Sequence, residues 1–130
     1  MKIAFVICRI LLGLGFVIFG ANIMFPFLPQ PAPVPGSLVE QFMTVMVPTH
    51  FMALIGFFQL IGGLCVLSGR MAPLGVVILA PILINILAFH VYLTAGEGLV
   101  PGLVFTVLEL VVAYDYRKYL SGIFTTHAKA

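Results

Sequence analysis

The stretch that decides the fold is GFFQLIGGLCVLSGRMAPLGVVILAPILINILAFH, residues 56–90, in which two long apolar runs are joined by SGRMA at 68–72. An apolar run of about twenty residues is long enough to cross the hydrocarbon core of a bilayer as a helix. Gly69 can take the left-handed conformation that ends a helix, and Pro73 is well tolerated in the first turn of the next one. The stretch therefore predicts a transmembrane hairpin.

The composition of the whole chain also indicates a membrane protein. Of its 130 residues, 62% are hydrophobic and only 8% are charged, which leaves too few polar side chains to cover the apolar surface in water. The net charge of +2 is too small, and the lysines and arginines are too scattered, for a nucleic-acid-binding surface. We therefore expect a single integral membrane domain over residues 1–130.

Four apolar runs predict four membrane-spanning helices at about residues 3–24, 49–68, 73–93 and 101–119. Between the first two, the proline-rich segment PFLPQPAPVPG at 26–36 predicts an extended connector. Ser37 and Glu40 have the spacing of a capping box, and they open a short amphipathic helix at 38–47 that we expect to lie at the membrane surface. The expected fold is all-α: an integral membrane four-helix bundle with a short interfacial helix in the first external loop.

The lysines and arginines other than Arg9 gather at one end of this topology. They are Lys2, Arg70, Arg117, Lys118 and Lys129, and the loops at the other end have none. By the positive-inside rule, both termini and the turn at Arg70 are cytoplasmic. We expect an integral protein of a prokaryotic inner (cytoplasmic) membrane.

Glycines recur on one face of each of the first two predicted helices. Gly13 and Gly20 share a face with Arg9, and Gly56 and Gly63 share a face of the next helix. Small residues let helix backbones approach closely. Both faces are therefore predicted to pack against a neighbouring helix, either within the bundle or on another subunit.

Arg9 and Glu109 are ionisable residues inside the predicted spans, where each costs about 2.5 to 3.5 kcal/mol to insert. At a rise of 1.5 Å per residue, both lie roughly 10 to 12 Å from the cytoplasmic end. Equal depth and opposite charge predict a structural ion pair. The alternatives are a carboxylate at Glu109 that handles protons or a quinone, and a contact with another subunit. If the pair forms, Glu109→Gln should damage the protein more than Arg9→Leu, because it strands a charge that arginine cannot lose.

Asn22, Gln59, Asn85 and His90 are the other polar residues singled out in the spans. Each can make an interhelical hydrogen bond. Alternatively, Gln59 orients a quinone carbonyl, while the other three contact a quinone ring or a polar headgroup. A haem site at His90 is not expected, because no second histidine falls within the bundle. No metal site and no intrinsic cofactor are predicted, and quinone or lipid are the ligands that these residues suit.

Three segments in combination resemble the DoxX family of small four-helix membrane proteins, and the resemblance extends over nearly the whole chain. They are RILLGLGFVIFGANIMF at 9–25, QLIGGLCVLSGRMAPLGVVILAPILINILAFH at 59–90 and VLELVVAYDYRKYL at 107–120. The resemblance implies a four-helix bundle associated with membrane redox complexes, because the family takes its name from a small subunit of a thiosulfate:quinone oxidoreductase system. The chain departs from similar sequences at Gln59, where an acid is common.

These features favour a non-catalytic accessory or structural subunit of a larger membrane complex concerned with electron transfer. The sequence has no redox CxxC, no nucleotide-binding loop and no catalytic triad, so we do not expect an enzyme. The alternative is a quinone-interacting membrane oxidoreductase subunit, in which Glu109 exchanges protons and Arg9, Gln59 or Asn85 orients the ring. The expected partners are the lipid bilayer and other membrane protein subunits.

Overall fold

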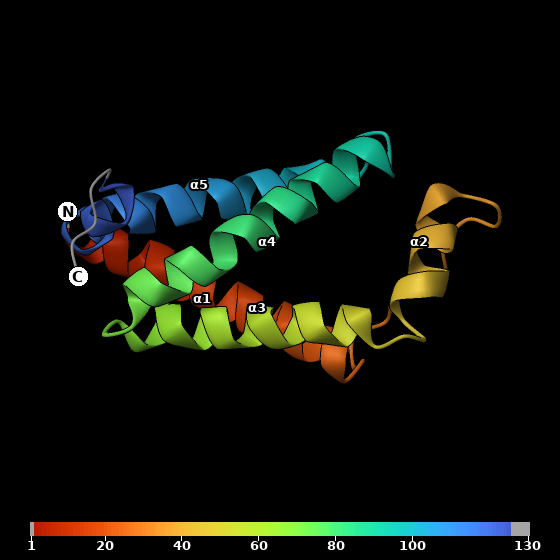
Figure 1. Cartoon of the computed structure of the whole chain (residues 1–130), viewed down its shortest axis with the longest axis horizontal. Coiled ribbons are helices and arrows are strands. Elements are labelled where there is room, and N and C mark those ends of the chain that lie inside the picture. Colours follow the sequence, from red (N-terminus) through yellow and green to blue (C-terminus); the bar gives the residue numbers. More distant parts are fainter. Residues whose placement is uncertain (1, 126–130) are drawn as a thin grey trace.

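The computed structural model describes residues 2–125, which form helices joined by short turns and one long connector (Figure 1). The elements are α1 Lys2–Met24, α2 Leu38–Met46, α3 Phe51–Ser68, α4 Ala72–Tyr92, α5 Leu99–Asp115, α6 Arg117–Leu120 and the 3₁₀ helix η1 Ser121–Phe124. No β-strand occurs between residues 2 and 125, so the all-α prediction is confirmed. Lys129, which contributed to the predicted orientation, lies outside the described residues.

The helices α1, α3 and α4 are each long and apolar enough to cross a membrane. A fourth span arises if α5 is counted together with α6 and η1, which follow it after a bend of 82°. The predicted limits of the first three spans agree with these helices to within two residues at each end.

The last predicted span, residues 101–119, is wrong at its end, because α5 stops at Asp115. The chain leaves the helical conformation at Tyr116, which has φ −96° and ψ 15°. Charged residues follow the apolar run here, and the Arg117 guanidinium donates a hydrogen bond to the Tyr114 carbonyl at 2.7 Å. This bond satisfies one of the carbonyls that a helix end leaves without an intrahelical partner.

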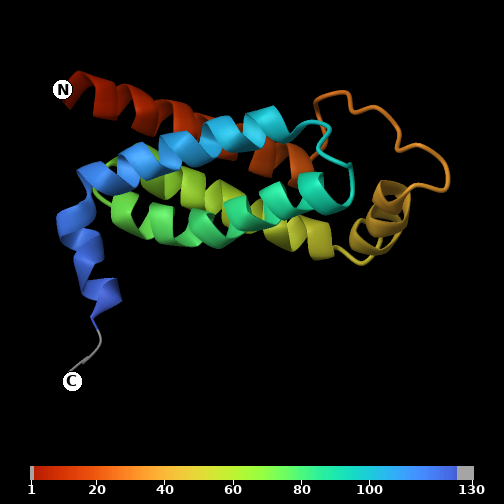
Figure 2. The same ribbon diagram turned by 90° about the horizontal axis from the view of Figure 1, so that it is seen from above.

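Each of the four long helices packs against two others: α1 against α3 and α5, and α4 against α3 and α5. The start of α1, the turn between α3 and α4, and the α6–η1 segment lie at one end of the molecule, and α2 lies at the other (Figures 1 and 2). The buried side chains between the helices include Leu12, Phe16, Val66, Leu79 and Val112.

Glycines bring the backbones of α1 and α3 together. A Cβ atom built on Gly20 would lie 2.6 Å from the Leu60 amide nitrogen and 2.7 Å from the Gly56 carbonyl oxygen, and one on Gly63 would lie 2.9 Å from the Gly13 carbonyl oxygen. These separations leave room only for hydrogen. The prediction that both glycine faces pack against a neighbouring helix is confirmed, and the two faces pack against each other.

The short helix α2 begins as its sequence predicts, with one difference. The Ser37 hydroxyl oxygen accepts a hydrogen bond from the Glu40 amide at 3.2 Å, as in a capping box. The Glu40 carboxylate accepts its bond from the Gly36 amide at 2.5 Å, one residue before the amide that a capping box would use. The helix ends at Met46, one residue before the predicted limit.

The close approach of α1 and α3 can be tested by comparing Gly20→Ala with Gly122→Ala. Inside a helix this substitution ordinarily stabilises a protein by about 0.5 to 1 kcal/mol. At Gly20 the added methyl group meets the backbone of α3, and overpacking costs about 1 to 3 kcal/mol. We expect Gly20→Ala to lower the thermal unfolding midpoint, measured by circular dichroism in a mild detergent.

Gly122 is the matched control, because a Cβ there meets no atom within 4 Å. Gly122→Ala should leave the unfolding midpoint unchanged or raise it slightly. If Gly20→Ala behaved in the same way, the two helices would not be as close as the structure places them.

Candidate functional site

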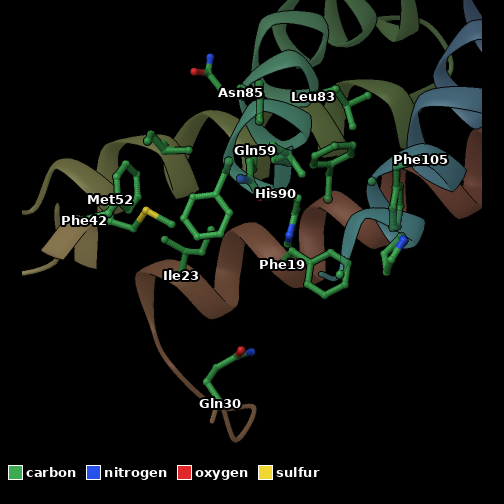
Figure 3. Close-up of a pocket in the computed structure, with 18 of the residues that line it drawn as sticks. Phe19, Ile23, Gln30, Phe42, Met52, Gln59, Leu83, Asn85, His90 and Phe105 are labelled. Carbon is green, nitrogen blue, oxygen red and sulfur yellow. The ribbon is translucent and has the colours of Figure 1, made fainter. Parts of the chain in front are cut away.

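A cavity of about 500 Å³ lies between the long helices, in the half of the molecule nearer α2 (Figure 3). Its walls are mostly apolar and rich in aromatic side chains. The aromatic residues are Phe16 and Phe19 of α1, Phe42 of α2, Phe89 of α4 and Phe105 of α5. The volume falls within the range of about 300 to 1,000 Å³ that is usual for small-molecule sites.

The position of the cavity depends on where glycines allow the helix backbones to come close to one another. The contact of α3 with α4 is tightest near their connecting turn, where a Cβ on Gly75 would lie 2.7 Å from the Gly62 carbonyl oxygen. Farther from the turn, α4 presents Ile82, Leu83 and Ile86 to the cavity. Figure 1 shows α4 and α5 diverging from α1 and α3 towards the end that carries α2.

Aromatic contacts close parts of this space. The ring of Phe105 packs edge-to-face against Phe16 and Phe19 of α1, with centroid separations of 5.4 and 5.9 Å. On the side of α2, the Phe42 ring meets the Phe89 ring at 5.3 Å. The apolar face of α2 therefore covers the cavity through Phe42, in addition to any contact that it makes with a membrane.

Gln59 is the buried polar residue that lines the cavity. Its side chain is only 4% exposed, it lines the cavity, and its amide makes no hydrogen bond within residues 2–125. The amide offers two N–H donors and one carbonyl acceptor to a bound molecule.

His90 contributes a second polar atom. Its Nδ1 lies 2.8 Å from the Glu97 carbonyl oxygen. Because a carbonyl oxygen only accepts, Nδ1 carries the hydrogen, and Nε2 of the neutral ring is left as an acceptor. The loop that supplies the Glu97 carbonyl is itself held by the Thr94 hydroxyl, which reaches that oxygen at 2.7 Å.

The two asparagines are placed differently. Asn85 lies at the rim, where its amide nitrogen donates to the Pro81 carbonyl at 2.9 Å, and Figure 3 shows its amide pointing away from the aromatic side chains. Asn22 does not line the cavity. Its side-chain oxygen accepts hydrogen bonds from the Phe27 and Leu28 amides at 3.0 and 2.8 Å, so it orders the start of the connector rather than bridging two helices or binding a ligand.

The structure does not bring Arg9 and Glu109 together as the predicted ion pair. The Arg9 Nη1 donates to the Val66 and Leu67 carbonyls at 3.0 and 2.6 Å, in the last turn of α3, where carbonyls lack intrahelical partners. Glu109 is 6% exposed, and neither of its carboxylate oxygens has a hydrogen-bond partner in the described part of the chain. The prediction compared depth and charge but not the direction of each side chain around its helix, and the face that Arg9 shares with Gly13 packs on α3.

The aromatic lining was missed from the sequence. In a chain that is 62% hydrophobic, phenylalanines such as Phe89 and Phe105 carry no pattern that separates a cavity wall from a lipid-facing surface. The amphipathic pattern of α2 was the available signal, since it places Phe42 on one apolar face.

The described residues contain no group that could hold a metal ion, and comparison with known proteins gives no relative from which a function of the site could be inferred. Among residues 2–125, no three His, Cys, Asp or Glu side chains are grouped so as to hold a metal ion, and Cys8 and Cys65 are free thiols. No family model, curated protein or solved structure matches the chain. The site is therefore interpreted from its own geometry.

Replacing Arg9 and Glu109 singly and together by methionine tests the contacts described above. Arg9→Met removes a charged donor from two carbonyls and should destabilise the protein by about 1.5 to 3 kcal/mol. Glu109→Met removes a buried acidic group that has no partner and should stabilise the protein. The measurement is the free energy of unfolding in mild detergent.

In the double variant we expect the two effects to add within about 0.5 kcal/mol, as for residues that do not interact. Glu109→Met should also be the milder of the two single changes, which reverses the order predicted from an ion pair. A coupling energy above about 1 kcal/mol would show that the two side chains do meet.

Proposed function

We propose that this chain is an integral membrane four-helix bundle of the DoxX type that binds a lipid-soluble quinone in the cavity. In this proposal it serves as an accessory subunit, without catalytic activity of its own, in a larger membrane complex concerned with electron transfer. The observation that carries the proposal is Gln59, a residue 4% exposed that lines an aromatic-walled cavity and whose amide makes no hydrogen bond within residues 2–125.

The outer surface of the four long helices supports the membrane placement. Large apolar side chains are exposed on each of them, including Ile7 on α1, Leu54 on α3, Ile84 on α4 and Leu110 on α5. Apolar surface that surrounds a molecule in this way is stabilised by lipid rather than by water. With the cationic end in the cytoplasm of a prokaryotic cell, α2 lies at the outer surface of the inner membrane.

The chemistry of the cavity suits both redox states of a quinone. The Gln59 amide N–H groups can donate to a quinone carbonyl, and His90 Nε2 can accept from a quinol hydroxyl. The aromatic walls suit a flat ring, which gains from edge-to-face and stacked contacts. A cavity that is largely apolar with a few polar groups is the usual form of a site for such a molecule.

The proposal keeps the accessory role predicted from the sequence and takes from the alternative only the binding of a quinone, which the cavity favours. The glycine faces of α1 and α3 are used inside the chain, so they no longer support a contact with another subunit. Arg9 and Glu109 do not line the cavity, so their predicted roles in orienting the ring and exchanging protons with it are not part of the proposal. Membership of a larger complex rests on the resemblance to DoxX proteins.

Quinone binding can be tested with Gln59→Leu and with Gln41→Leu as a matched control. Gln41 lies on α2 in an exposed position and does not line the cavity. Losing a hydrogen bond worth about 1 kcal/mol corresponds to roughly a fivefold loss of affinity. We expect Gln59→Leu to weaken the binding of a short-tailed benzoquinone about fivefold in mild detergent, while Gln41→Leu leaves the dissociation constant unchanged.

Extraction of the purified protein, followed by mass spectrometry, should recover quinone together with co-purifying membrane subunits. If the wild-type protein carries no quinone and does not bind the benzoquinone, the proposed ligand is wrong. If both variants bind as the wild type does, the cavity is not the quinone site.

A further inference from the structure

A second cavity, of about 640 Å³, lies at the other end of the molecule, in the angle where the chain turns away from α5. Its walls come from α4, α5 and the α6–η1 segment, and they include the small residues Ala80 and Ala113. Leu120 of α6 also lines it and belongs to the buried core, so α6 is anchored against the long helices. We call this second cavity the α4–α5 groove.

The α6–η1 segment bounds the groove and runs across the direction of the long helices. It is bent from α5 by 82°, and Figure 2 shows it turned away from the other helices. In a protein whose long helices cross a bilayer, such a segment lies in the plane of the surface. Its exposed side chains fit that place: Tyr119 is 74% exposed and Phe124 is 82% exposed, and amphipathic aromatic residues concentrate at membrane interfaces.

Arg117 lies at the rim of the groove, and its side chain is held by two contacts with Tyr114. Its Nη1 donates to the Tyr114 carbonyl at 2.7 Å, and its guanidinium carbon lies 4.2 Å from the centroid of the Tyr114 ring. The Nε and Nη2 donors make no hydrogen bond within residues 2–125, so they are available to a ligand. A guanidinium that presents several N–H donors in one plane suits the oxygens of a phosphate.

The charge at this end is positive. Lys2, Arg70, Arg117 and Lys118 lie there, against the single carboxylate of Asp115 among the described residues. Lysines and arginines near a membrane surface attract acidic lipids over a distance of about a Debye length. The cationic surface therefore favours a lipid with net negative charge over a zwitterionic one.

We infer that the α4–α5 groove binds one acidic phospholipid from the leaflet on this side of the membrane. An acyl chain lies against Ala80 and Ala113, and the phosphate lies on the free donors of Arg117. The inference shares with the proposed function only the premise that the helices span a bilayer. It does not depend on the quinone cavity, which lies in the other half of the molecule.

The test is native mass spectrometry of the purified full-length chain, titrated with phosphatidylglycerol and, separately, with phosphatidylcholine. We expect one phosphatidylglycerol to be retained per chain in preference to phosphatidylcholine. Arg117→Gln should weaken its binding about fivefold or more, because it removes charged hydrogen bonds to the phosphate. Ala80→Phe should weaken it as much or more, because the ring fills the groove.

Arg70→Gln is the matched control, because it removes the same charge from the same end but lies outside the groove. It should change the affinity less than twofold. The thermal unfolding midpoint of each variant is measured beside its binding. If Arg117→Gln does not fold, Ala80→Phe decides the question, because it leaves every charge in place.

Three results would overturn the inference: equal retention of the two lipids, a loss in Arg70→Gln as large as in Arg117→Gln, or unchanged binding in Ala80→Phe. Displacement of the lipid by glycerol phosphate would also overturn it, because the site would then bind a phosphate without needing acyl chains. A protein that binds phosphatidylglycerol but no quinone would remove the proposed function and leave this inference standing.

Discussion

The close contact of α1 with α3 is the constraint on which the rest of the arrangement depends. The amide of Leu60 and the carbonyl of Gly56 occupy the space that a side chain on Gly20 would need. Between apolar helices, van der Waals packing of close backbones is the main source of association, since lipid is as apolar as the side chains. Once this pair has formed, α4 can follow α3 closely only as far as Gly62 and Gly75 reach. The remaining length of α4 and α5 diverges, and the cavity occupies that space.

Within this apolar frame, most polar groups find partners in the backbone rather than in one another. Arg9 binds the carbonyls at the end of α3, Asn22 binds the amides of the connector, and His90 binds the carbonyl of Glu97. Helix ends and loops are the places where a membrane protein has backbone groups to spare. Gln59 lies far from any such end and has no partner in the described chain, which is why the cavity offers its amide to a ligand.

The sequence predicted the helices well because the signals for them are local. Long apolar runs, Gly69 after Ser68 and the capping serine of α2 each act within a few residues, and the structure has helices at those places. The pairing of Arg9 with Glu109 was wrong because it required knowing which way each side chain points around its helix. The face of Arg9 could have been inferred from Gly13 on the same stripe, since a close-packing face brings the arginine to α3. The aromatic walls of the cavity could not be predicted, because they depend on how far α4 diverges from α3.

Glu109 is the buried polar residue to which no contact has been assigned, and its position limits which partners could reach its carboxylate. The residue is 6% exposed, and it lines neither the aromatic-walled cavity nor the α4–α5 groove. Of the alternatives predicted from the sequence, a contact with another subunit requires a partner that can reach the side chain. Both carboxylate oxygens are buried in the described part of the chain, so a second subunit reaches them only if the surrounding side chains or helices move. A partner for Glu109, whether from this chain or from another subunit, therefore requires a movement of these helices or of the side chains between them.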